Sequence, residues 1–267
     1  MQLRHRVALD GVWLDSVDSR IMISKIEEPD GKENVNTVSL WGESGSRVTE
    51  KHRDSLDVTV KFQIRLKKRE MAAREEVLEK VNTWAYAGGW LSTNYKNDRR
   101  IRVFLAQAAG AGDPWDWTKE YSLVFRACGV PYWQMANPSS VMRSGTNYEH
   151  LNMSVSGSTK SVLEAQFVNT SGSTIDTVSI DAGESAMSFS GLGLGNGETL
   201  VIDHDDNGLR AFLRIRILST GGVWRSAMGK RNPASSNELT VSPGQHTVVF
   251  SAGGTGKITV SNYGRFA

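Results

Sequence analysis

The chain has few of the residues that carry metal, redox or nucleophilic chemistry. It contains a single cysteine, Cys128, so no internal disulfide can form, and a cysteine-based zinc site, which needs several thiolates, is excluded. Its histidines never pair at the spacing of metal ligands, and no Gly-x-Ser-x-Gly segment accompanies them. We therefore expect no catalytic residues, no metal and no cofactor, and we expect that the chain is not an enzyme.

An excess of charge of one sign and long apolar runs are also absent. The 31 basic and 29 acidic residues leave a net charge of +2, which is too even for nucleic-acid binding as the main activity. No stretch approaches the roughly 18 apolar residues of a membrane helix, and the charged start of the chain has no apolar run of a secretory signal behind it. We expect no membrane partner, no sequence-specific nucleic-acid partner, and assembly in a reducing cytoplasm.

Three segments begin like ligand-binding loops but lack a residue that the motif requires. Residues 203–208 place oxygen ligands as a calcium loop does, but the twelfth position is Arg214, a cation where a bidentate glutamate is needed. Residues 191–197 lack the last glycine of a dinucleotide-binding loop. Residues 253–257 resemble a phosphate-binding loop, but Ser251 stands where its first glycine belongs. We expect all three segments to be turns.

Strict alternation of apolar and polar residues is the strongest signal. Residues 56–66 are apolar at every second position, which predicts a long β-strand with one buried face in an antiparallel sheet. Residues 69–85 then show helical spacing, and Gly88 and Gly89 supply a stop, so this segment predicts an α-helix. It is the one strong helix signal in the sequence.

Short alternating segments make up most of the remaining chain. Residues 101–105 and 121–127 predict a hairpin around a loop at residues 110–114. The second half predicts an antiparallel β-sandwich or jelly roll, because its segments follow one another too closely for crossover helices. These segments are residues 163–167, 199–202, 209–217, 248–250 and 258–260.

The tryptophans indicate two domains. Of the 8 tryptophans only Trp224 lies in the second half, so the two halves differ in amino-acid composition. Residues 137–140 are polar and turn-forming, which suits a linker. We predict domains at residues 1–136 and 137–267, in a chain that is mainly β.

Two basic groups are candidates for binding an acidic partner. Arg210, Phe212, Arg214 and Arg216 share the outer face of one predicted strand and form a basic strip of guanidinium and aromatic groups. The alternative for both groups is an outer face that is merely solvated. The second group flanks the helix and consists of Lys67, Lys68, Arg69, Arg99, Arg100 and Arg102.

Three stretches in order resemble the distal tail protein family of long-flexible-tailed bacteriophages. The first is RDSLDVTVKF at residues 53–62, leading into the predicted helix. The second is WTKEYSLVFRA at residues 117–127, followed by VPYW, which is similar to the close of the family's N-terminal domain. The third comprises residues 197–203, the turn LTVSPG and residues 260–265, similar to the family's C-terminal domain. The resemblance spans nearly the whole chain.

The resemblance implies a structural virion protein at the distal end of a phage tail, assembled in the host cytoplasm. Its expected fold is an N-terminal β-sandwich with one α-helix and a hairpin, followed by a galectin-like antiparallel β-sandwich. In that family six copies form a ring that connects the tail-tube protein to the tail-tip hub or tail-associated fibre protein. Some members also hold receptor-binding proteins, but this C-terminal part has no room for their long arm or inserted carbohydrate-binding module.

A closed ring would complete the open edges of antiparallel sheets, because every joint supplies another chain. We therefore predict that the strand at 56–66 and the helix at 69–85 lie at or beside the contact between copies. The alternative for the tryptophans is that they fill the domain's own core. The candidate interface residues are Leu56, Phe62, Leu66, Arg74, Leu78, Trp84 and Trp90.

Two other functions are left open by the sequence. A carbohydrate-binding module of a tail or cell-surface adhesion protein fits the predicted sandwich, but it usually needs exposed aromatic side chains, of which the second half has few. A cell-wall hydrolase would need paired carboxylates or a metal constellation in a pocket. Saturable glycan binding by residues 137–267, or turnover of peptidoglycan, would favour these functions over a scaffold.

Overall fold

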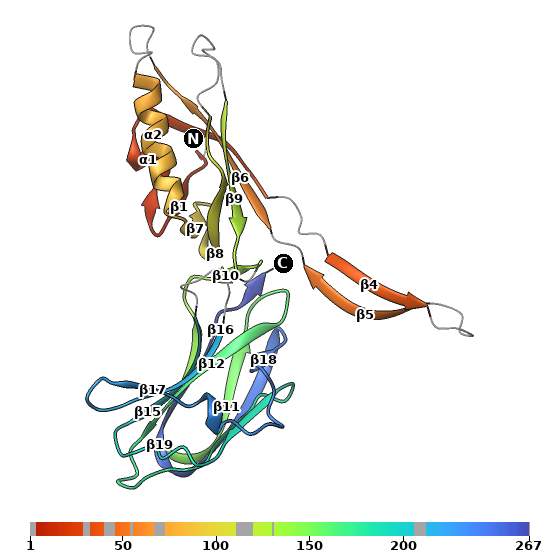
Figure 1. Cartoon of the computed structure of the whole chain (residues 1–267), viewed down its shortest axis with the longest axis vertical. Helices are drawn as coiled ribbons and strands as arrows, with labels where there is room; N and C mark the ends of the chain where they lie inside the picture. Colours follow the sequence, from red (N-terminus) through yellow and green to blue (C-terminus); the bar gives the residue numbers. More distant parts are fainter. Residues whose placement is uncertain are drawn as a thin grey trace. The chain divides into compact units, whose positions relative to one another are not determined.

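The chain divides by its internal contacts into two compact units, Met1–Trp133 and Gln134–Ala267, called here the N-terminal and C-terminal units (Figure 1). The structure, a computed structural model, describes residues 4–28, 33–39, 46–53, 56–66, 73–110, 120–129, 131–205 and 212–266. Among these residues no helix has the length and apolar character needed to span a membrane. The domain boundary after residue 136 stays a prediction.

The N-terminal unit is built on one antiparallel sheet. Its strand order is β2-β1-β7-β8-β9-β6-β3. A separate two-stranded sheet pairs β4 (Glu33–Ser39) with β5 (Ser46–Arg53). The strands of the larger sheet are β1 (Val7–Leu9), β2 (Val12–Trp13), β3 (Ile21–Glu27), β6 (Asp57–Ile64), β7 (Gly89–Thr93), β8 (Lys96–Gln107) and β9 (Tyr121–Ala127).

The long alternating segment is a strand, as predicted, and it forms β6. Val58, Val60 and Phe62 are fully buried while the residues between them are half-buried, so the predicted inner and outer faces are confirmed. The strand lies inside the sheet, paired with β3 on one side and β9 on the other. Across the second pairing Phe62 stacks on Tyr121 with ring centroids 5.5 Å apart.

The predicted helix is confirmed as α2 (Ala73–Tyr86), which packs along one face of the sheet (Figure 1). The predicted start at residues 69–72 lies outside the described residues. Gly88 has φ +60, and a Cβ there would lie 2.9 Å from the Val103 carbonyl oxygen, so this turn requires glycine. The side chains that α2 buries are Arg74, Val77, Leu78, Val81 and Ala85. A shorter helix, α1 (Leu14–Val17), had no sequence signal.

The predicted hairpin at residues 101–127 is confirmed in its pairing. β8 and β9 are antiparallel neighbours, with Val103 opposite Ala127 and Leu105 opposite Phe125. Most of the expected loop, from residue 111, lies outside the described residues. The pairing buries Ile101 and Val103 on the side that faces α2.

The C-terminal unit is an antiparallel sandwich with one large core, which confirms the mainly β class. Its strand order is β14-β13-β19-β12-β15-β16-β17, with β11 paired to β19 and β18 to β12. Phe167 of β12 meets Phe250 of β19 in that core, with ring centroids 4.9 Å apart. The strands are β11 (Ser139–Val155), β12 (Ser161–Asn169), β13 (Val178–Asp181), β14 (Ala186–Phe189), β15 (Thr199–Asp205), β16 (Phe212–Leu218), β17 (Trp224–Ser226), β18 (Thr240–Val241) and β19 (Gly244–Asn262). Two short strands, β10 (Trp133–Met135) and β20 (Arg265–Phe266), and the 3-10 helix Met228–Lys230 complete the list.

One turn prediction in this unit is wrong. Residues 253–257 lie inside β19, so the segments at 248–250 and 258–260 are parts of one strand rather than two. The strand pairs with β13 up to Ala252 and with β12 from Gly256, so it passes from one neighbour to the other at the glycines. A Cβ on Gly256 would lie 2.3 Å from Phe167, which shows that glycine serves close packing here rather than chain reversal.

Candidate assembly surfaces

Most of the interface residues expected from the sequence lie inside the N-terminal unit. Phe62 is fully buried, and Leu56, Leu78 and Arg74 are 5%, 4% and 6% exposed. Leu66, two residues past the end of β6, is half-buried. These side chains stabilise the unit's own core, and their contact with another copy stays a prediction.

Trp84 is half-buried on α2 and is held by contacts within the unit. Its indole N–H donates to the Val12 carbonyl oxygen at 3.0 Å, and its ring meets Phe125 edge-on with centroids 6.1 Å apart. Both contacts suit a residue that fills the space between helix and sheet. Its role as an anchor between copies is not tested by this geometry.

Trp90 lies on the other face of the sheet, beside two arginines. The neighbouring strand β8 places Arg100 at 4.2 Å and Arg102 at 5.7 Å from the centroid of the Trp90 ring. Both distances suit a cation–π contact. The half-buried Trp90 and its arginines therefore form a basic and aromatic surface.

A bidentate ion pair extends this surface. Arg126 of β9 donates to both carboxylate oxygens of Asp57 on β6, at 2.8 and 2.9 Å. Hydrogen bonding to the Arg126 guanidinium holds the pKa of Asp57 below its usual value. The carboxylate therefore stays ionised and locks the guanidinium in place at neutral pH.

The predicted basic strip on β16 is only partly described, because Arg210 and the side chain of Phe212 lie outside the described residues. Arg214 donates to both carboxylate oxygens of Asp203, at 3.1 and 3.0 Å, and Arg216 donates to one of them at 2.8 Å. The Arg216 guanidinium also lies 4.1 Å from the centroid of the Trp224 ring. One acid thus binds two of the arginines, and partner binding by the strip stays a prediction.

The same pairing explains why residues 203–208 begin like a calcium loop. Asp203, the first residue of this segment, stands opposite Arg214 in the β15–β16 register. The arginine at the twelfth position therefore pairs with the carboxylate that would be the first calcium ligand. His204 is buried on the opposite side of β15. Across the described residues, no three His, Cys, Asp or Glu side chains gather as a metal site.

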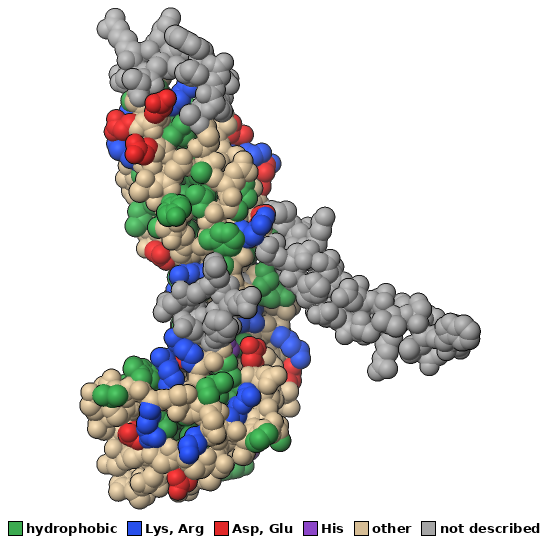
Figure 2. Space-filling view, viewed as in Figure 1, with side chains coloured by type: hydrophobic (Ala, Val, Ile, Leu, Met, Phe, Trp, Pro, Cys, Tyr) green, Lys and Arg blue, Asp and Glu red, His purple; other side chains and the backbone are tan. Residues whose placement is uncertain are grey.

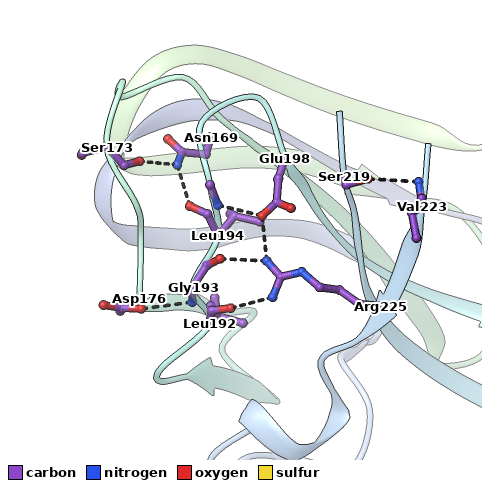
Figure 3. Close-up of polar contacts among 11 residues, drawn as sticks. Asn169, Ser173, Asp176, Leu192, Gly193, Leu194, Glu198, Ser219, Val223 and Arg225 are labelled. Carbon is purple, nitrogen blue, oxygen red and sulfur yellow. Dashed lines mark hydrogen bonds and ion pairs between the residues drawn. The ribbon is translucent and has the colours of Figure 1, made fainter. Parts of the chain in front are cut away.

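The glycine-rich segment at 191–197 is held by protein groups, as Figure 3 shows. The N–H of Gly193 donates to Asp176 at 3.0 Å, and the N–H of Gly195 donates to Glu198 at 2.7 Å. Arg225 donates to the Gly193 carbonyl oxygen and to Glu198, both at 2.7 Å. The N–H groups of Gly193 and Gly195 thus have carboxylate partners, and those of Leu192, Leu194 and Gly197 donate to backbone carbonyl oxygens.

The exposed side of α2 forms an open cleft with Ala109, at the end of the chain segment that follows β8. The cleft has a volume of about 530 Å³ and is lined by two carboxylates, Glu75 and Glu79, with the exposed Tyr86 at its other end. Two of its lining residues are joined directly, because the side-chain amide of Asn82 exchanges two hydrogen bonds of 3.0 Å with the backbone of Ala109. Neither the cleft nor its acidic character was predicted from the sequence.

The β4–β5 sheet was also missed. Residues 33–39 pair with residues 46–53, with one irregularity between Asn36 and Thr37. The segment is mostly polar and lacks strict alternation, which is the signal on which the other strands were predicted.

No protein-family model and no curated protein sequence matches the chain. Its fold is shared with proteins of phage tail hubs and baseplates. The Dit protein of phage SPP1, a paradigm of the hub adsorption apparatus in Gram-positive-infecting phages, matches with a TM-score of 0.68 at 12% identity, over 98% of this chain and 99% of its own. Two chains from the activated phage p2 baseplate also match. The chain solved with calcium has a TM-score of 0.53 at 8% identity, over 99% and 98% of the two chains. The chain solved with strontium has a TM-score of 0.51 at 9% identity, over 97% of each chain.

Proposed function

We propose that this chain is a distal tail protein, a structural component of a phage tail tip. In this role six copies close into a ring that connects the tail-tube protein to the tail-tip hub or fibre protein. The protein acts in the virion, at the distal end of the tail, after assembly in the host cytoplasm. It performs no chemistry of its own.

The observation that carries this proposal is the extent of the match to SPP1 Dit, which covers 98% of this chain and 99% of the other. A likeness over both units, in the same order, favours a common architecture rather than one shared domain. The resemblance of three ordered sequence stretches, found independently of the fold, supports the same family.

The β4–β5 sheet gives a physical reason for assembly. Among the described residues its two strands pair only with each other. A two-stranded sheet alone is marginally stable in water, so it gains stability when another chain completes it. A ring provides that chain at every joint.

The test is the mass of the purified full-length chain, measured by native mass spectrometry, with negative-stain images of the same sample. We expect a closed ring of six copies with an open centre. A chain that stays monomeric at every concentration examined, or that forms only two-fold dimers, contradicts the proposal.

A variant without the β4–β5 sheet sharpens this test. Replacing residues 33–53 by a short glycine-serine linker should leave the N-terminal unit folded, as judged by tryptophan fluorescence, while ring formation is lost. The matched control shortens the turn between β16 and β17, which belongs to the C-terminal unit, and should assemble like the original chain.

The carbohydrate-binding alternative is less well supported. The C-terminal unit exposes Tyr148 and Trp224, but these residues lie on strands that are not neighbours, because β17 ends the strand order and β11 lies off it, paired with β19. A sugar platform needs aromatic rings on one continuous surface, and one face of Trp224 already carries Arg216.

A further inference from the structure

The face of the N-terminal sheet that points away from α2 carries an arginine-rich aromatic surface. Its members are Trp90 of β7 and Arg100, Arg102 and Phe104 of β8, called here the Trp90 face. Both guanidinium groups lie over the Trp90 ring, and Phe104 is 37% exposed. Arginine and aromatic side chains are the residue types most enriched in protein interfaces. This composition suits contact with another protein surface that is acidic and partly aromatic.

The exposed side of α2 has the complementary character. The α2 cleft contains Glu75, Glu79 and Tyr86, and Tyr86 is 83% exposed. The one exposed lysine of the helix, Lys80, is bonded to Glu76 outside the cleft. Figure 2 shows several acidic side chains over the upper part of α2, although others lie elsewhere on the N-terminal unit.

The two surfaces lie on opposite sides of one sheet. Successive side chains of a strand point to opposite faces, and on β8 the buried Ile101 and Val103 face the helix side. Arg100, Arg102 and Phe104 therefore face the other side. A head-to-tail joint between identical copies requires two different surfaces on each copy that fit each other, which these two supply.

We propose that the Trp90 face of one copy docks onto the α2 cleft of the next copy. This inference rests on the ring of the proposed function and identifies the surfaces that form its joint. In the joint Arg100 and Arg102 bind Glu75 and Glu79, because a guanidinium donates two parallel hydrogen bonds to a carboxylate. Tyr86 packs against the aromatic side chains of the Trp90 face, which gives the joint its apolar centre.

Charge reversal tests this joint directly. The helix variant is E75K/E79K, and the sheet variant is R100E/R102E, both in the full-length chain. Each variant alone places like charges in every joint, so we expect each to need at least about tenfold higher concentration to form rings. Native mass spectrometry at the concentration where the original chain is fully assembled measures the loss.

Mixing the two variants gives the decisive result. In a ring where the variants alternate, every joint again pairs opposite charges, so an equimolar mixture should restore rings with equal numbers of both. Restored assembly also demonstrates that both variants are folded. If each variant forms rings alone, or if folded variants do not assemble when mixed, the proposed joint is wrong.

Two single substitutions are the matched controls. Glu76→Lys makes the same charge change on α2 outside the cleft, and Lys257→Glu makes the opposite change on an exposed position of β19. Both should form rings like the original chain. If the original chain itself forms no ring, both the proposed function and this inference are wrong. If the charge-reversed variants form rings as readily as the original chain, only this inference is wrong.

Discussion

The two units differ in how they deal with open sheet surface. In the C-terminal unit two layers bury each other's apolar faces, and Phe167 and Phe250 meet at their centre. In the N-terminal unit one large sheet is covered by α2 on one side, and its other side carries the Trp90 face. One unit thus packs sheet against sheet, whereas the other covers one face of its sheet with a helix.

The edges of the sheets show the same contrast. The edge strand β14 is covered within its own unit, because the N–H groups of Ala186 and Ser188 donate to the Ser236 and Ser235 hydroxyls, each at 3.0 Å. Within the described part of the N-terminal unit, β3 pairs only with β6 and the β4–β5 sheet pairs with nothing else. Open edges invite pairing with another chain unless they are shielded, so assembly is expected to depend on the N-terminal unit.

The largest expected effect separates the stability of the two units. Phe250→Ala removes a fully buried ring from the C-terminal core and should cost that unit about 3–5 kcal/mol of unfolding free energy. Of the 8 tryptophans only Trp224 lies in this unit, so tryptophan fluorescence follows the N-terminal unit and far-UV circular dichroism follows both. In urea unfolding, the transition followed by circular dichroism should therefore show a loss of stability, while the transition followed by fluorescence should not change. Tyr148→Ala, at an exposed position of the same unit, is the control. Equal losses of stability by fluorescence and by circular dichroism would show that the two units do not unfold separately.

Trp84→Ala should destabilise the N-terminal unit and leave the stability of the C-terminal unit unchanged. It removes a half-buried ring that packs on Phe125 and donates to Val12, at a cost of about 2 kcal/mol or more. Trp84→Phe keeps an aromatic ring and loses the hydrogen bond, so about 1 kcal/mol is expected. The same variants test the predicted anchor role, because Trp84→Ala protein that stays folded and still forms full rings contradicts it.

Gly256→Ala tests whether the glycines of β19 serve close packing. The added Cβ would lie 2.3 Å from both Phe167 and the Val168 carbonyl oxygen, so overpacking of about 1–3 kcal/mol is expected in the C-terminal unit. At Gly229 a Cβ meets nothing within 4 Å, which makes Gly229→Ala the matched control. Equal stability of the two variants would show that β19 bends freely at this point.

The smallest expected effect concerns acid. A hydrogen bond from Arg20 lowers the pKa of Asp18 to about 2, so the folded state stabilises the ionised carboxylate. This contribution is fully present above the unfolded pKa near 4 and is lost as the pH falls through about 2. Asp18→Asn should therefore flatten the acid sensitivity of the fluorescence-detected transition, by less than about 1 kcal/mol. An unchanged dependence of stability on pH would show that Asp18 does not contribute. The stability of the C-terminal unit should be the same in the variant and in the original chain.

Sequence reasoning succeeded where a segment carries its own periodicity. β6 and α2 follow from alternation and from helical spacing, because burial of one face imposes both patterns on the chain. It failed at β19, where glycines look like a turn until the ring of Phe167 fills the space beside Gly256. It also missed the β4–β5 sheet, whose polar strands have no strong pattern.

The sequence by itself determined that the chain is mainly β, that one helix follows one long strand, and that an internal disulfide and a cysteine-based zinc site are excluded. Only the tertiary structure decided which charges meet, since Asp57 and Arg126 are far apart in the chain and form a bidentate pair through neighbouring strands. It also decided that Phe62 and Leu78 belong to the core while Trp90 and Tyr86 face outward. The physical reason is that periodicity is a local property, whereas the partner of a side chain depends on which strands pair.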